Sequence, residues 1–137
     1  MNNNDHLINK ILQESKTIAV VGLSPKTERT SHQVAAYLQK NGYRIIPVHP
    51  GANQVLGEKS YSRLSEINDP VDLVLVFRRS EFVPEVVQDA IRVKPGFLWL
   101  QEGIVHEEAA RTAAESGMEV IMDRCMFKEH RRRMRER

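Results

Sequence analysis

Five short apolar runs, separated by segments of helical period, constrain this chain more than any other feature of its sequence. The runs are residues 17–23, 44–48, 72–77, 97–100 and 119–122. They show little alternation of apolar and polar side chains, which is typical of strands buried on both faces of a sheet. Strands separated by helices pair in parallel, because each right-handed crossover returns the chain in the same direction. The pattern therefore predicts an α/β fold, a doubly wound, Rossmann-like sandwich with a five-stranded parallel sheet.

The segments between the runs predict the helices. Asp5 is expected to cap a short amphipathic helix near the N-terminus. Thr30 and the three residues after it have the spacing of a capping box, which predicts that Thr30 caps the next helix. A short helix is expected around Leu64, and Pro84 is compatible with a helix only in its first turn. Residues 107–116 predict an alanine-rich helix, and the remainder of the chain predicts a terminal helix.

Length and composition predict one globular domain that spans residues 1–137. Hydrophobic residues make up 41% and charged residues 28% of the chain, which argues against disorder and against a membrane protein. The apolar runs are too short to cross a bilayer, and the first residues lack the pattern of a signal peptide. A single cysteine, Cys125, cannot form an internal disulfide. We therefore expect a cytoplasmic protein.

Positive charge gathers at the C-terminal end of the chain. The formal net charge is +2, yet residues 124–137 hold seven Lys or Arg and two Glu. A solvated terminal helix is the commoner meaning of such a run, and contact with nucleic acid or an anionic ligand is the alternative. We do not expect this chain to bind nucleic acid.

The turn after the first strand predicts an anion site. In a doubly wound sheet the ligand lies beyond the carboxyl ends of the strands, where the strand order reverses. Residues 22–30 contain one glycine and so fail the dinucleotide fingerprint, and they match neither a P-loop nor a hydrolase elbow. They do offer a close backbone approach at Gly22, a hydroxyl at Ser24, two cations at Lys26 and Arg29, and a following helix N-terminus. Such a set suits a phosphate or pyrophosphate; the alternative is a capped surface loop.

The next two strand ends add a histidine and two arginines. His49, followed by Pro50, stands where an NAD site usually has an acidic residue, and the missing carboxylate argues against NAD as the ligand. The alternative is a histidine that simply caps the strand end. Phe77, Arg78 and Arg79 could hold a purine and a further phosphate. Alternatively, the phenylalanine belongs to the core and both arginines are solvated.

Candidates for catalysis are few. Gly103 lies in a turn where backbone could approach a ligand, and a bare turn would also place glycine there. His106 lacks the second histidine of a zinc-protease motif, and the five histidines show no metal spacing. A half-buried thiol is the simpler interpretation of Cys125. We expect no metal site, and no residue pattern demands an enzyme.

Five segments together resemble the stand-alone bacterial and archaeal CoA-binding proteins. They are residues 17–24, 47–50, 76–78, 99–104 and 122–126, and the likeness covers nearly the whole stretch from 17 to 133. That family is similar in fold to the nucleotide-binding domain of the succinyl-CoA ligase α subunit. The combination of segments, in this order, is much more specific than any one of them.

The resemblance implies that coenzyme A lies across the strand ends. Its phosphates would lie at the turn that follows the first strand, its adenine and ribose near the ends of the second and third strands, and its pantetheine at the turn after the fourth. The residues expected to bind it are Gly22, Leu23, Ser24, Pro25, Lys26, Arg29, His49, Pro50, Phe77, Arg78, Gln101, Gly103 and Ile104.

Two departures from the ligase limit what the resemblance implies. Ala52 stands where the ligase domain carries a lysine after its second strand, which puts a phosphate contact there in doubt. The ligase's second domain and its phosphorylated histidine have no counterpart, so we do not expect acyl-CoA synthesis by this chain alone. The leading hypothesis is a protein that binds CoA or an acyl-CoA, without catalysis of its own. An NAD(P)-dependent oxidoreductase and a nucleotide-sensing nucleic-acid-binding regulator are the alternatives.

Overall fold

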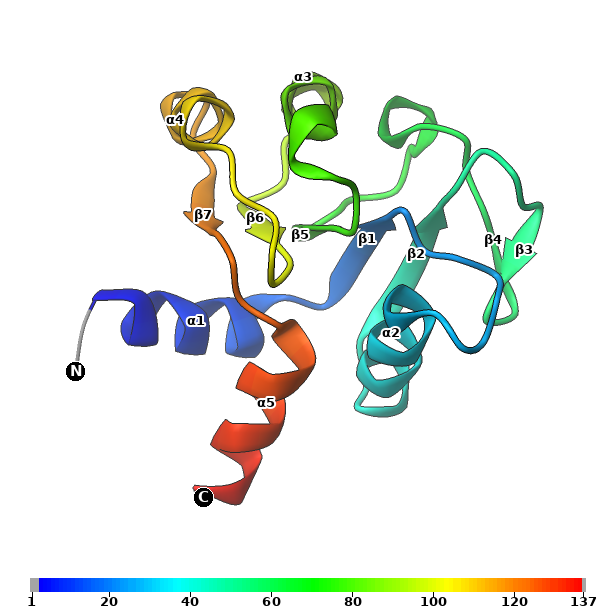
Figure 1. Ribbon diagram of the computed structural model, residues 1–137, viewed down its shortest axis with the longest axis horizontal. Helices are drawn as coiled ribbons and strands as arrows, with labels where there is room; N and C mark the ends of the chain where they lie inside the picture. The colour runs from blue at the N-terminus through cyan, green and yellow to red at the C-terminus, as the bar shows by residue number, and fades with distance from the viewer. Residues whose placement is uncertain (1–2, 137) are drawn as a thin grey trace.

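The centre of the molecule is a parallel sheet of five strands in the order β2-β1-β5-β6-β7 (Figure 1). The computed structural model describes residues 3–136. The strands are β1 (Thr17–Val21), β2 (Arg44–Val48), β5 (Leu73–Val76), β6 (Phe97–Leu100) and β7 (Glu119–Ile121). All four pairings in the sheet are parallel, so the predicted fold class is confirmed. The chain runs outward from β1 to β2 and then crosses to β5 on the other side of β1, so the strand order reverses between β1 and β5.

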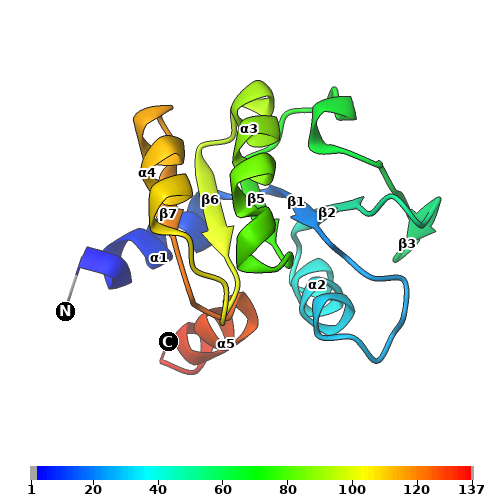
Figure 2. The ribbon, with the colours of Figure 1, turned by 45° about the horizontal axis from the view of Figure 1, so that its top comes forward.

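Helices cover both faces of this sheet. One face packs against α1 (Asn3–Glu14), α2 (Thr30–Lys40) and α5 (Met126–Arg135), and the other against α3 (Val83–Val93) and α4 (Glu107–Glu115). Figure 2 shows α3 and α4 side by side on their face of the sheet. Successive β1 residues point to opposite faces, because Ile18 and Val20 belong to one core cluster and Ala19 and Val21 to the other. Burial on both faces is the physical reason for the missing alternation in the sequence.

Each edge strand is covered by another part of the chain. Beside β2 lies a small hairpin of β3 (Gln54–Val55) and β4 (Glu58–Lys59), which the sequence did not predict. Beside β7, Lys10 of α1 pairs with Glu119 at 2.7 Å. These contacts protect strand edges that would otherwise be open to pairing with another chain.

Most predicted helices are confirmed, and two predicted caps are wrong. The helix around Leu64 is a single 3-10 turn, η1 (Leu64–Glu66), and Pro84 does lie in the first turn of α3. Thr30 is the first residue of α2 rather than its cap; the N-cap is Arg29, whose side chain makes no capping hydrogen bond. Asp5 lies inside the first turn of α1, where its carboxylate accepts a hydrogen bond from Arg133.

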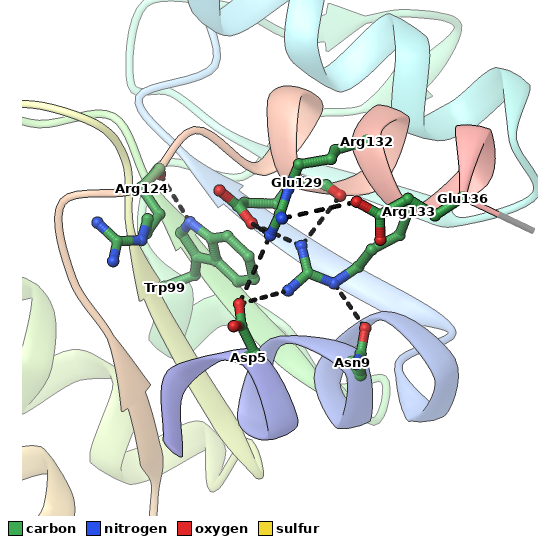
Figure 3. A network of polar contacts seen from close by, with 8 residues as sticks. All are labelled: Asp5, Asn9, Trp99, Arg124, Glu129, Arg132, Arg133 and Glu136. Atoms are coloured by element: carbon green, nitrogen blue, oxygen red, sulfur yellow. Dashed lines mark hydrogen bonds and ion pairs between the residues drawn. The ribbon is translucent and has the colours of Figure 1, made fainter. Parts of the chain in front are cut away.

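The charge of the C-terminal segment predicted a solvated helix. Instead, α5 is anchored to α1 by hydrogen bonds (Figure 3). Arg133, whose side chain is only 14% exposed, donates hydrogen bonds to Asn9 and to the carboxylates of Asp5 and Glu129. Arg132 lies 3.2 Å from Glu129 and 3.5 Å from Asp5. Acidic residues of α1 and α5 therefore pair with two of the seven basic residues in this segment, Arg132 and Arg133. No helix within residues 3–136 is long and apolar enough to span a membrane.

Candidate ligand-binding site

Gly22, at the end of β1, holds three strand ends together. Its backbone φ is +86°, and a Cβ at this position would lie 2.7 Å from the carbonyl oxygen of Phe77 at the end of β5. Its N–H donates to the carbonyl of Val48 at the end of β2 (2.9 Å). The left-handed conformation and the contact with Phe77 both require glycine, whether or not a ligand is bound. The sheet itself therefore explains the residue that the sequence suggested for a ligand.

The loop between β1 and α2 is fixed by side chains of its own ends. The Ser24 N–H donates to the hydroxyl of Ser31 (3.0 Å), and the Lys26 N–H donates to the hydroxyl of Ser24 (3.0 Å). The Nδ1 of His32 lies 2.9 Å from the carbonyl of Ser24. These bonds hold the loop against the first turn of α2, whose backbone amides have no side-chain cap. The turn is thus preorganised for an anion.

A first cleft of about 640 Å³ opens in front of this loop. Two exposed cations from the loop, Lys26 and Arg29, border it, and His49 and Phe77 form part of its far wall. The positive side chains and the amino end of α2 both favour negative charge. The lining residues are Gly22, Ser24, Pro25, Lys26, Arg29, Thr30, Ser31, His49, Gly51 and Phe77.

A second cleft of about 620 Å³ adjoins the first, and Thr30 and Phe77 line both. It runs along the ends of β5 and β6 toward the amino end of α5. Its lining residues are Thr30, Phe77, Arg78, Arg79, Ser80, Gln101, Glu102, Gly103, Ile104, Cys125 and Lys128. The two clefts together follow the carboxyl edge of the sheet across the point where the strand order reverses.

Arg78 and Arg79 both lie over the same aromatic ring, that of Phe82. The Arg78 guanidinium lies 4.5 Å and that of Arg79 lies 5.2 Å from the ring centre of Phe82 in η2 (Ser80–Phe82). Each also faces a glutamate at 3.6 Å, Glu85 and Glu81 respectively. These longer, exposed ion pairs are weak, so both guanidinium groups remain able to exchange a carboxylate for a phosphate.

His49 is held in the turn after β2. Its Nδ1 accepts a hydrogen bond from the N–H of Gly51 (3.0 Å), so in the neutral ring the proton is on Nε2. The predicted strand-end histidine therefore does cap its turn, and its ring also lines the first cleft. A neutral ring in this tautomer can donate one hydrogen bond to a ligand.

The far end of the second cleft combines a buried amide, a thiol and an ion pair. Gln101 is only 4% exposed, and its Oε1 accepts the N–H of Met126 (3.3 Å) at the start of α5. Cys125, the N-cap of α5, is 8% exposed. Lys128 pairs with Glu102 across the rim, at 3.0 and 3.1 Å to its two oxygens. This hydrogen bond is the main cause of the raised pKa of Lys128.

Eleven of the thirteen predicted binding residues line one of the two clefts. The side chain of Leu23 is fully buried in the core, so only its backbone can face a ligand. Pro50 borders a neighbouring hollow of about 390 Å³, which it shares with Arg78. The binding prediction omitted Lys128, which lines the second cleft from α5. Within residues 3–136, no group of three or more His, Cys, Asp or Glu could hold a metal ion.

The chain is similar to known proteins in sequence and in fold. The chain is 48% identical over 123 residues to an uncharacterized protein, YneT, from Bacillus subtilis, covering 90% of this chain and 91% of that protein. It is 30% identical to the α subunit of an ADP-forming acetate–CoA ligase from Pyrococcus furiosus, covering 77% of this chain but 26% of the ligase subunit. A solved structure of a hypothetical protein from Pyrococcus horikoshii superimposes with a TM-score of 0.90 at 38% identity, covering 93% of this chain and 90% of that one. A family model described as a CoA binding domain matches residues 16–131, and the chain belongs to that family.

Proposed function

We propose that this protein binds coenzyme A, free or as an acyl-CoA, across the two adjoining clefts. The observation that carries the proposal is a groove made of two adjoining clefts at the switch point of the sheet, with Lys26 and Arg29 lining the first and Arg78 and Arg79 lining the second. Membership of the CoA-binding domain family supports a CoA-related ligand.

In this proposal the ligand phosphates occupy the first cleft, between the loop cations and the amino end of α2. The adenosine lies near His49, Phe77 and Arg78, and the pantetheine extends into the second cleft toward Gln101. Leu23 would contact the ligand through its backbone only, because its side chain is buried in the core.

The charge of the groove favours CoA over NAD. A 3′-phosphorylated adenosine brings more negative charge than NAD, and five cations line the two clefts: Lys26, Arg29, Arg78, Arg79 and Lys128. NAD sites usually place a carboxylate after the second strand for the ribose hydroxyls, whereas His49 stands there with its Nδ1 already engaged.

A single free thiol, Cys125, supports our expectation of a cytoplasmic location.

Thermal melting with three ligands tests the proposal. A ligand at a hundred times its dissociation constant stabilises the fold by roughly 2.7 kcal/mol, which moves the melting temperature of a domain of this size by several degrees. CoA should raise the melting temperature more than dephospho-CoA or NAD at equal concentration. An equal or larger shift with NAD would favour the oxidoreductase, and no shift with CoA would contradict the proposal.

Ser24 offers a matched pair of variants for the same assay. Ser24→Trp fills the first cleft and should abolish the shift caused by CoA, while the ligand-free protein still melts cooperatively. Ser24→Ala leaves the cleft open and loses only the hydroxyl that accepts the Lys26 N–H, so it should retain most of the shift.

A further inference from the structure

The amide nitrogen of Gln101 has no hydrogen-bond partner within residues 3–136. Gln101 lines the second cleft, and only 4% of its surface is exposed. Its side-chain oxygen accepts a hydrogen bond from the N–H of Met126. Since the oxygen accepts that bond, the NH₂ group is the free end of the side chain. No hydrogen bond among the described residues uses this NH₂ group. The NH₂ group is therefore available to donate a hydrogen bond into the cleft, where a carbonyl oxygen of a ligand would be a suitable acceptor.

A nucleophile lies on the same wall of the cleft. Cys125 also lines the second cleft, and it occupies the N-cap of the ten-residue helix α5, which begins with Met126. The first backbone amides of a helix point outward, and they favour negative charge. A substrate carbonyl oxygen that gains negative charge beside Cys125 would therefore lie near the amide of Gln101 and the amino end of α5. This combination of a thiol and hydrogen-bond donors is suited to acyl transfer.

We propose that Cys125 exchanges acyl groups with an acyl-CoA bound in the groove. The sulfur of Cys125 attacks the thioester carbonyl, a new C–S bond forms, and the carbonyl oxygen becomes an oxyanion that Gln101 stabilises. The bond to the CoA sulfur then breaks, CoA leaves as the thiol with the proton that Cys125 gave up, and the acyl group remains on Cys125. One thioester replaces another, so the step needs no oxidant and no further reactant. The inference rests on the proposed function, because bound CoA brings the thioester to this end of the groove.

Binding should make the exchange much faster than the same reaction in free solution. A ligand held by its phosphates at the α2 end presents its far end to Cys125, and such positioning raises the effective concentration of the reacting groups. A thioester without the nucleotide gains nothing from the groove. The ratio between the two donors therefore reports transfer within a complex.

Mass spectrometry of the intact, full-length protein tests the proposal. Incubation with acetyl-CoA should add one acetyl group, on Cys125, that neutral hydroxylamine removes. S-acetyl-N-acetylcysteamine at equal concentration should label at least about ten-fold more slowly. Adenosine 3′,5′-bisphosphate, which lacks pantetheine, should slow labelling by acetyl-CoA. Equal rates with both donors, or acetyl groups on lysines alone, would overturn the proposal.

Two variants complete the test. Cys125→Ala should remove the label, and Gln101→Glu should slow it about ten-fold or more, because glutamate still accepts the Met126 N–H but has no NH₂ group to donate. If acetyl-CoA raises the melting temperature of the wild-type protein but leaves no label, the acyl exchange is wrong and the proposed function stands. If acetyl-CoA changes neither the melting temperature nor the mass, both are wrong.

Discussion

Substituting alanine for Gly22 should destabilise the protein in the absence of any ligand. The added Cβ would lie 2.7 Å from the carbonyl oxygen of Phe77, a separation that real Cβ atoms essentially never show. The obstacle is backbone in the neighbouring strand, so β1 and β5 must move apart near their ends. The substitution therefore tests whether the sheet, rather than the ligand, requires this glycine.

Gly103 is the matched control for the size of the effect. Its φ of +88° is close to the +86° of Gly22, but a Cβ on Gly103 would meet nothing within 4 Å. Alanine in the left-handed region costs roughly 1–2 kcal/mol at either position. Overpacking against Phe77 adds typically 1–3 kcal/mol at Gly22 alone. We expect the free energy of unfolding to fall by about 2–5 kcal/mol in Gly22→Ala and by about 1–2 kcal/mol in Gly103→Ala.

Urea denaturation of the wild-type protein and the two variants measures this difference. A loss of about 2–5 kcal/mol is a large part of the 5–15 kcal/mol that typically holds a domain together, so Gly22→Ala should unfold at a clearly lower urea concentration. Equal losses in the two variants would refute the role assigned to the Phe77 carbonyl.

Three further predictions concern other parts of the fold. His106→Ala should lower the free energy of unfolding by about 1 kcal/mol in urea denaturation, because the His106 side chain caps α4 by accepting the Ala109 N–H; an unchanged value would contradict the cap. Burial raises the pKa of Tyr37 above its usual 10.0, so the stability due to its protonated form is present below about pH 10 and is lost as pH rises through the raised pKa. The melting temperature of Tyr37→Phe should accordingly fall less between about pH 9 and 11 than that of the wild-type protein, and an equal fall would show that other groups dominate. Arg133→Ala should cost about 1–3 kcal/mol in urea denaturation at low salt, and less at high salt, because it breaks the contacts of α5 with α1; a loss independent of salt would contradict an ionic role.

The strands of this protein are predictable from sequence because a buried parallel sheet leaves a strong local signal. Residues 97–100 and 44–48 coincide with β6 and β2, since both faces of these strands meet helices or loops of the core. The hairpin of β3 and β4 was missed because its two-residue strands are mostly polar and exposed. Its turn residues Leu56 and Gly57 both have positive φ, and only the glycine is a residue type that predicts such a turn from sequence.

The residues that line the clefts were predictable where they follow a strand. The loop with Lys26 and Arg29 and the end of β5 can be found from the fold rule that ligands lie at strand carboxyl ends. The contacts made by α5 could not, because they depend on how a helix near the C-terminus packs against α1 and α2. The ion pair of Lys128 with Glu102, and of Arg133 with Asp5, join residues that are 26 and 128 positions apart.

Calorimetric titration of CoA into the wild-type protein and two arginine variants tests the central claim most directly. Arg29 borders the first cleft, whereas Arg111 is an exposed arginine of α4 on the opposite face of the sheet. A charge-assisted hydrogen bond contributes roughly 1.5–3 kcal/mol, so Arg29→Gln should weaken CoA binding by at least about ten-fold. Arg111→Gln should bind CoA as the wild-type protein does, with one CoA per chain. No binding by the wild-type protein, or equal affinities for the wild-type protein and Arg29→Gln, would contradict a CoA site in this groove.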